Sequence, residues 1–573
     1  MCSLEQTTLP RPRPSAPRRA SLIGAAATAA LLAVATPALF VKTASAAERP
    51  PVIGPHAAVS AGHPLTSAAA LEVLTRGGNA FDAGVAALLV GGVVEQDNYS
   101  LGGEALVLVY PKSDGKVTAV VGQGWAPKNA SIDAYAARGE TLEGHGLNPA
   151  VVPGALHAAL TVLERWGTMS FEEVSARAIE YAELGFPLRP RTVTAIRRNM
   201  KFFEDWPDNQ RYWLKPDLAM YRPGDTIRLP TLARTLTRMV EAERAHKGEG
   251  RAAGVAAARD RFYKGDIAEE MVTFLKRKGA PFERDDFAEF FAKVEEPSHT
   301  TYRGYDVYKH SFGSQGPALL EALNILENFD LKSMGQNSAD YLHVVTESLK
   351  LAYADRDTFY GDQAFVTTPA EGLLSKAYAK ERAKLIDMKH ASRSFIAGNP
   401  MAYDSKVKQW AYWTADLKEA APSPRLPDPE RVSGAKDTTH ISIIDKDGNI
   451  FDSTPSGGWI GGAVILGDTG IGMSVRGEQF WLDKTRAAQL RPRARPRYTL
   501  TPSIVLRNGE PFMAIGTPGG DNKEQTIIQR GEAKAAPYMK SPSPTGEGES
   551  RPRCRKDQLL VQRRTAILPV QLP

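Results

Sequence analysis

The chain has 573 residues, 42% of them hydrophobic and 24% charged, so it can bury a large core and is too long for one small module. Its formal charge of +6 comes from residues 1–46 and 530–573, which hold 14 of the 71 basic and 5 of the 65 acidic residues. Residues 47–529 therefore hold 57 basic and 60 acidic residues. Nucleic-acid binding is therefore not indicated. The two cysteines, Cys2 and Cys554, lie near opposite ends, which argues against a disulfide framework, a cysteine metal site and a thiol nucleophile.

Residues 1–46 have the pattern of an export signal. Arg18 and Arg19 precede an apolar stretch from Leu22 to Phe40, and the small residues Ala44-Ser45-Ala46 then form a signal-peptidase site. The arginine pair also fits a twin-arginine signal. We expect an exported protein, periplasmic or secreted, with no stable membrane span once the signal is removed. An uncleaved anchor is the alternative, because the apolar run approaches the length of a bilayer span.

The first part of the mature chain is predicted to combine helices with one hairpin. Apolar residues recur at helical spacing over 64–94 and break at Gly77-Gly78-Asn79, which predicts two helices joined by a turn. Two β-prone runs, 105–110 and 117–121, predict a hairpin. Residues 154–390 are mostly helical by period.

The second part is predicted to be β-rich. A Pro-rich polar stretch over 420–435 is typical of an exposed linker that ends at Asp437. β-prone runs follow, separated by turn residues, at 439–444, 450–453, 503–506 and 512–515. Residues 530–573 turn to Pro, Arg, Glu, Ser and Gly without period, and no packed element is predicted there before about the last ten residues.

Two features of this second part can carry chemistry. Thr438 lies where the linker meets a strand, and a cut before it would create an N-terminal Thr, whose amine can act as general base for its own hydroxyl. A Thr pair at a strand start is otherwise only a β-former. The glycine turn at 516–520 would expose backbone N–H groups suited to an oxyanion or another anionic group, although a plain strand-to-helix turn is an equal alternative.

From about Val59 to Gln529 the chain resembles the γ-glutamyltransferases (γ-glutamyltranspeptidases, glutathione hydrolases) of the N-terminal-nucleophile (Ntn) hydrolase superfamily. The segments that carry the resemblance, in chain order, are His63-Pro64-Leu65, Gly77 to Ala83, Leu101-Gly102-Gly103, Val152-Pro153-Gly154, Phe262-Tyr263-Lys264-Gly265, Ala354-Asp355-Arg356, Thr438-Thr439-His440, Asp445 to Asn449 and Gly516 to Gly520.

The resemblance implies an α+β fold, a four-layer αββα sandwich formed by two subunits cut from one precursor. The cleavage site would lie between Asp437 and Thr438, giving a large α-rich subunit (47–437) and a small β-rich subunit (438–529) that pair as a heterodimer. Thr438 would be the nucleophile and Ser456 a hydroxyl bonded to it, with the N–H groups of Gly519 and Gly520 as oxyanion hole. The reaction would be cleavage of a γ-glutamyl (glutathione-like) or related acyl amide, a small molecule or a peptide, through an acyl-enzyme on Thr438. Water (hydrolysis) or an amine (transpeptidation) would be the acceptor. No metal or cofactor is implied.

The substrate pocket departs from the family pattern. Gln123 stands where the family has an arginine that holds the α-carboxylate of the glutamyl group. Gln479 aligns with the acidic residue that holds the α-amino group, although Glu478 lies beside it. Tyr498 and Thr499 align with two carboxylate-binding serines, and an asparagine aligns with Gly458. Four nearby arginines, at 476, 493, 495 and 497, offer either a new anion site or ordinary loop charge.

Two alternatives to a γ-glutamyl enzyme therefore stay open. One is an Ntn amidohydrolase for a non-glutamyl acyl group. The other is a catalytically dead or truncated relative, because the atypical tail at 530–573 replaces the expected end of the small subunit and would leave sheet edge and core exposed.

Overall fold

The computed structural model describes residues 56–393, 396–412 and 437–529, together with the backbone of 560–561. All the described residues belong to one compact unit. The predicted export signal, linker and tail lie outside the described residues, apart from 437 and 560–561. Every helix among the described residues is too short or too polar to cross a membrane.

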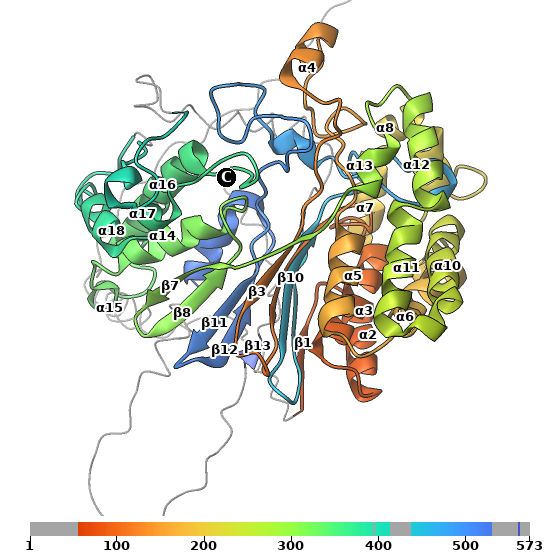
Figure 1. Ribbon diagram of the computed structural model, residues 1–573, viewed down its shortest axis with the longest axis horizontal. Helices are drawn as coiled ribbons and strands as arrows, with labels where there is room; N and C mark the ends of the chain where they lie inside the picture. The colour runs from red at the N-terminus through yellow and green to blue at the C-terminus, as the bar shows by residue number, and fades with distance from the viewer. Residues whose placement is uncertain (1–55, 394–395, 413–436, 530–559, 562–573) are drawn as a thin grey trace, which may run out of the picture. The chain divides into compact units, whose positions relative to one another are not determined.

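Two sheets of mainly antiparallel strands form the centre of this unit, one of six strands and one of five among the described residues (Figure 1). The first sheet has the order β1 (Ala58–Ser60), β9 (Ile441–Ile444), β10 (Ile450–Ser456), β2 (Glu104–Tyr110), β3 (Thr118–Gly122) and β6 (Lys293–Glu295). The second has the order β13 (Leu560–Val561), β12 (Glu510–Ile515), β11 (Ser503–Arg507), β8 (Tyr305–Lys309) and β7 (Ser298–Tyr302). A separate pair joins β4 (Phe186–Pro187) and β5 (Thr226–Ile227).

Helices cover the outer face of each sheet. Those on the side of the first sheet are α2 (Pro64–Thr75), α3 (Ala80–Val94), α5 (Ala155–Trp166), α6 (Phe171–Leu184), α10 (Pro230–Ala245), α11 (Arg251–Tyr263) and α12 (Asp266–Arg277), with the shorter α4 (Ile132–Arg138), α7 (Pro190–Arg198), α8 (Met200–Asp205), α9 (Pro207–Trp213) and α13 (Arg284–Ala288) in the connections. Those on the side of the second are α14 (Gly316–Leu326), α15 (Leu331–Met334), α16 (Ala339–Phe359), α17 (Ala370–Leu373) and α18 (Lys376–Ala383). Short 3₁₀ turns are η1 (Lys247–Glu249), η2 (Pro400–Tyr403), η4 (Gly467–Thr469), η5 (Arg476–Gln479) and η6 (Gly520–Asn522).

Apolar clusters of the described residues hold these layers together. Side chains of alternate residues in β2 point to opposite faces, so Val107 packs under the helices and Leu108 packs between the sheets. Ile504 and Leu506 of β11 meet Leu108 in the inter-sheet core. A third cluster joins α14 and α16 to the second sheet. The four layers, helix, sheet, sheet and helix, confirm the expected αββα sandwich.

The helix pair and the hairpin were predictable because local signals mark them. Asn79 caps α3 and forms a capping box with Asp82, and all fifteen residues of α3 are buried, as its continuous apolar composition requires. The predicted hairpin is β2–β3. The prediction of mostly helical structure over 154–390 missed β6, β7 and β8, which are short and half exposed and therefore lack a strong alternating pattern.

Chain segments from both sides of the Asp437–Thr438 bond interleave in the two sheets. In the first sheet β9 and β10 lie between β1 and β2, and in the second β11 pairs with β8. A cut at that bond would therefore leave two pieces that share both sheets and much of the core.

Candidate active site

Thr438 lies three residues before β9 of the first sheet, beside the last residue of β10. It forms an isolated antiparallel bridge with Ser456, and its Oγ lies 3.1 Å from the Ser456 Oγ. Both residues are buried, Thr438 with 5% and Ser456 with none of its surface exposed. The structure thus brings together the two hydroxyls whose pairing the family resemblance implied.

The carbonyl oxygen of Asp437, at the predicted cleavage bond, accepts two side-chain hydrogen bonds. The Trp459 indole N–H donates to it at 2.6 Å and the Ser456 hydroxyl at 3.1 Å. The peptide N–H of Thr438 donates to Asp437 Oδ1 at 2.9 Å. The other carboxylate oxygen, Oδ2, accepts from Arg191 at 2.8 Å. The main-chain carbonyl and the side-chain carboxylate of Asp437 are therefore both held in place by hydrogen bonds.

His440, two residues after Thr438, holds β9 against β10. Its Nδ1 lies 3.2 Å from the Thr454 Oγ, and its Nε2 lies 2.8 Å from the Ser442 Oγ and 3.0 Å from Asp452. A Cβ placed on Gly516 would lie 2.3 Å from this imidazole, so only glycine lets the backbone approach. This close contact brings the start of the glycine turn next to the segment 438–440 that leads into β9.

The glycine turn itself is anchored to the helices on the second sheet. Gly519 and Gly520 both have positive φ, at +124° and +55°. The Gln315 side-chain amide donates to the Gly520 carbonyl at 3.0 Å, and Arg356 of α16 forms an ion pair with Asp521 at 2.8 Å. The predicted helix after the turn is present at 523–529.

The predicted substrate residues lie on several elements. Gln123 directly follows β3, and strand pairing of Gly122 with Ala105 and of Ala105 with Pro455 puts it at the same end of three adjacent strands as Ser456. Its side chain is fully buried, and its Nε2 donates to the Gly124 carbonyl at 3.3 Å.

The other four residues differ in their surroundings. Glu478 and Gln479 form the end of η5, where both are half-buried. The Tyr498 ring packs with Leu106 and Leu500, and burial raises the pKa of its phenol well above the usual value. Thr499 is buried beside it.

Sequence reasoning did not single out Trp459, Arg191 or Lys523. Lys523 is fully buried, and its Nζ makes no hydrogen bond to the described residues. Burial, helped by the charge of Arg476, lowers the pKa of this amine to about 7. Patterns could not mark Trp459 and Arg191, because each contacts Asp437 from a distant position in the sequence.

Arg476, one of the four arginines noted in the sequence, lies close to these groups. Its guanidinium carbon lies 4.8 Å from the centre of the Trp459 ring, and its Nε is 3.6 Å from a Glu104 carboxylate oxygen. Its Nε and Nη2 atoms are buried and make no hydrogen bond to the described residues. Arg495, in contrast, is occupied, because it donates to the Gln123 and Phe291 carbonyls.

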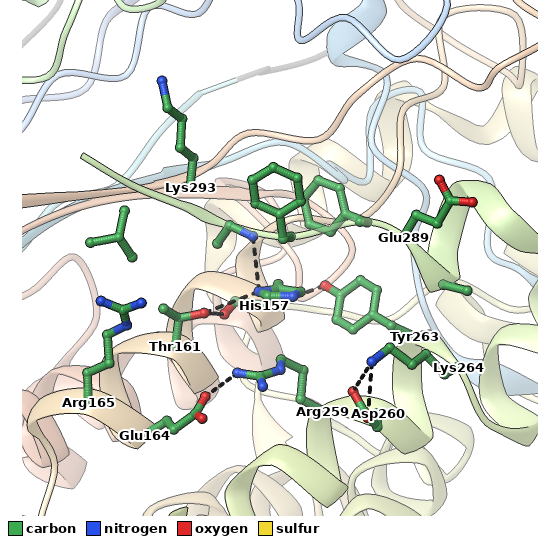
Figure 2. Close-up of a pocket in the computed structure, with 15 residues that line it drawn as sticks. His157, Thr161, Glu164, Arg165, Arg259, Asp260, Tyr263, Lys264, Glu289 and Lys293 are labelled. Atoms are coloured by element: carbon green, nitrogen blue, oxygen red, sulfur yellow. Dashed lines mark hydrogen bonds and ion pairs between the residues drawn. The ribbon is translucent and has the colours of Figure 1, made fainter. Parts of the chain in front are cut away.

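A cavity of about 590 Å³ lies elsewhere, between α5, α11 and the segment 288–294 (Figure 2). His157 is at its centre, where its Nδ1 accepts the Ala292 N–H at 3.1 Å. Burial lowers the pKa of His157 to about 3, so the ring is neutral at ordinary pH. The flanking charges are paired as Arg259–Glu164 and Lys264–Asp260. This cavity contains none of the predicted site residues, and we do not assign it to the chemistry.

Residues 66–530 match the model of the Gamma-glutamyltranspeptidase family. The chain belongs to the γ-glutamyltranspeptidase family. Its relatives within this family differ in what they act on. The "Glutathione hydrolase-like YwrD proenzyme" of Bacillus subtilis (strain 168) is 32% identical over 477 residues, which are 83% of this chain and 81% of that protein.

Two solved structures are also similar. That of LmbA2991HD has a TM-score of 0.75 and 32% sequence identity, covering 87% of this chain and 84% of that one. That of the cephalosporin acylase from Bacillus halodurans has a TM-score of 0.72 and 26% identity, covering 86% and 82%. These relatives include a glutathione hydrolase-like protein and a cephalosporin acylase. Membership of the family therefore does not define the acyl group of the substrate.

Proposed function

We propose that this chain is the precursor of an exported amidohydrolase or acyltransferase with an N-terminal Thr nucleophile. The observation that carries the proposal is the pairing of the Thr438 and Ser456 hydroxyls at 3.1 Å, directly beside the peptide bond that must be cut. Cleavage between Asp437 and Thr438 releases the amine that serves as general base. We propose large and small subunits of residues 47–437 and 438–529, with the tail after them.

The mechanism follows from the groups at this site. In the cut enzyme the Thr438 amine takes the proton of its own hydroxyl, and the Oγ attacks the carbonyl carbon of the substrate amide. The amine passes that proton to the leaving nitrogen, and an ester on Thr438 remains. Water or an acceptor amine then attacks this ester and regenerates the hydroxyl. Ser456 orients the Oγ, and the N–H groups of Gly519 and Gly520 stabilise the developing oxyanion. We propose that no metal or cofactor takes part.

The interleaved strands support a stable heterodimer after cleavage. Separation of the two pieces would remove β9 and β10 from the first sheet and β11 and β12 from β8, and would expose the inter-sheet core. Burial of that apolar surface and the strand hydrogen bonds hold the pieces together without a covalent link.

We propose that the acyl group is acidic but is not a γ-glutamyl group. Gln123 and Gln479 cannot supply the two charged contacts that an amino acid head group requires, and charged hydrogen bonds contribute roughly 1.5 to 3 kcal/mol each. Arg476 stacks on Trp459, which contacts the Asp437 carbonyl, so it lies close to Thr438. Its Nε lies 3.6 Å from the Glu104 carboxylate, and its buried Nη2, which makes no hydrogen bond to the described residues, suits a carboxylate of the acyl donor.

The test is the intact mass of the purified full-length protein, with N-terminal sequencing of any fragments. We expect two chains, the smaller beginning Thr-Thr-His-Ile, and a single uncut chain without amidase activity for Thr438→Ala. A wild-type chain that stays whole would contradict the proposal and favour an inactive relative. An uncut Thr438→Ala protein that still turned over substrate would contradict the assignment of the nucleophile.

A further inference from the structure

The carbonyl that self-cleavage would attack already has two hydrogen-bond donors. The Trp459 Nε1–H lies 2.6 Å and the Ser456 Oγ 3.1 Å from the Asp437 carbonyl oxygen. Two donors at about 2.7 to 3.1 Å are the arrangement that stabilises a developing oxyanion. We propose that Trp459 and Ser456 form the oxyanion site for cleavage of the Asp437–Thr438 bond, and this rests on the proposed function.

The position of Trp459 is fixed by the turn that precedes it. Gly457 and Gly458 leave the end of β10 with φ of +80° and +62°, which reverses the chain. A Cβ on Gly457 would lie 1.8 Å from the Glu104 Oε2, and one on Gly458 would lie 2.1 Å from the Ser100 Oγ. Larger residues are therefore excluded from this turn.

The indole ring is also held on its face. Trp459 is 3% exposed, and the Arg476 guanidinium lies over it at 4.8 Å. This stacking leaves the ring edge with its N–H directed at Asp437. A donor held so firmly needs no reorganisation when charge develops on the oxygen, which is the condition for effective oxyanion stabilisation.

The step is an N-to-O acyl shift. The Thr438 Oγ bonds to the Asp437 carbonyl carbon, closing a five-membered ring, and the carbonyl oxygen becomes negative. Collapse breaks the C–N bond, and the proton lost by the hydroxyl ends on the Thr438 nitrogen. In this proposal the Asp437 carboxylate takes the hydroxyl proton as the C–O bond forms and passes it to the nitrogen as the C–N bond breaks; its Oδ1 lies 2.9 Å from that nitrogen. Water then hydrolyses the ester, which leaves a carboxylate on Asp437 and restores the Thr438 hydroxyl.

Self-cleavage and substrate turnover would thus use different oxyanion donors. Trp459 and Ser456 serve the carbonyl on the N-terminal side of Thr438, whereas Gly519 and Gly520 are proposed to serve the substrate. A change at the Trp459 N–H should therefore delay the appearance of the two chains, whether or not it alters later turnover.

The experiment follows the disappearance of purified full-length precursor with time in Trp459→Phe and Trp459→His. Phe keeps an aromatic ring and removes the N–H, so we expect cleavage about 100-fold slower than in the wild type. His keeps a ring N–H and should cut faster than Phe. The matched control is Trp125→Phe, because the buried Trp125 indole also donates to a carbonyl, that of Asp286 at 2.9 Å, and this carbonyl is not cut. Its cleavage rate should equal that of the wild type.

Thermal unfolding midpoints identify any variant that fails to fold. A folded Trp459→Phe variant that is cleaved at the wild-type rate would overturn the proposal. Folded Phe and His variants that are cleaved equally slowly would also overturn it, because the size of the ring would then matter and its N–H would not. If only the Trp459→His variant folds, its rate is compared with that of Ser456→Ala. Cleavage of the His variant that is too slow to detect would overturn the proposal, and cleavage faster than that of Ser456→Ala would support it. A wild-type precursor that never cuts would instead contradict the proposed function.

Discussion

Arg191 and Asp437 lie 246 positions apart in the chain and form an ion pair at 2.8 Å. Arg191 belongs to α7 and also contacts the buried Asp97 at 2.9 Å. It therefore ties the residue before the cleavage bond to the helices on the first sheet. The same Asp437 carboxylate accepts a hydrogen bond from the Thr438 N–H. The ion pair with Arg191 therefore orients the Asp437–Thr438 peptide bond as well as the Asp437 side chain.

We expect Arg191→Gln to slow self-cleavage by about tenfold, because loss of one charged hydrogen bond costs roughly 1.5 to 3 kcal/mol and Arg191 is partly exposed to screening water. Densitometry of precursor and products over time measures this. Arg198→Gln is the control, since Arg198 is an exposed residue of the same helix. Equal rates in the two variants would mean that the ion pair does not orient the bond.

Ser456 contacts both reacting groups of the precursor, the Thr438 hydroxyl and the Asp437 carbonyl. We expect Ser456→Ala to slow self-cleavage by about 100-fold, because it removes an oxyanion donor as well as the contact with Thr438. In the cut enzyme only the contact with Thr438 is lost, and kcat should fall by about tenfold. Ser456→Thr keeps the hydroxyl and should recover most of both rates. If Thr is no better than Ala, the hydroxyl is not the group that matters.

The sequence and the structure agree best where signals are local. The break at Gly77-Gly78-Asn79, the β-prone runs at 105–110 and 117–121, and the turn residues around Asn449 each depend on residues a few positions apart. Each predicted its element correctly. The pairing of Thr438 with Ser456 was expected from the resemblance, and the structure places the two side chains in contact.

What could not be predicted depends on packing between distant segments. The Trp459 indole contacts Asp437 only because two glycines reverse the chain after β10. Arg191, which lies 246 positions earlier in the sequence, contacts Asp437 from α7. The edge strand β7 and its neighbour β8 have polar, half-exposed sequences that take strand form only by pairing with each other and, for β8, with β11. No single window of sequence contains these relationships.

Acid should destabilise the folded chain through three buried histidines. Burial lowers the pKa of His63 to about 4 and of His157 and His310 to about 3, against an ordinary value of 6.5. Between those values the unfolded chain binds protons that the folded chain does not, so stability falls as pH falls below about 6.5. Each histidine contributes up to about 1.4 kcal/mol per pH unit.

We expect the thermal midpoint to fall from pH 7 to pH 4.5, and His157→Asn to flatten that fall. The exposed His299 on β7 supplies the control, because His299→Asn should leave the pH dependence unchanged. A fall as steep in His157→Asn as in the wild type would show that this ring is not the source.

The acyl group can be tested with three anilides of equal chain length. γ-Glutamyl-p-nitroanilide carries a carboxylate and an ammonium, glutaryl-p-nitroanilide only the carboxylate, and pentanoyl-p-nitroanilide neither. Because Gln123 and Gln479 offer no charged partners and Arg476 offers a buried cation, we expect kcat/KM to be highest for the glutaryl compound, at least about tenfold above the γ-glutamyl one.

Arg476→Met should lower the ratio of glutaryl to pentanoyl turnover, since the carboxylate would lose its partner while the apolar chain would not. Arg507→Met, at an exposed position on β11, is the control and should keep the ratio. A γ-glutamyl rate above the glutaryl rate in the wild type would mean that Glu478 or another group replaces the missing charged contacts, and the proposed acyl class would then be wrong while the Thr438 mechanism still held.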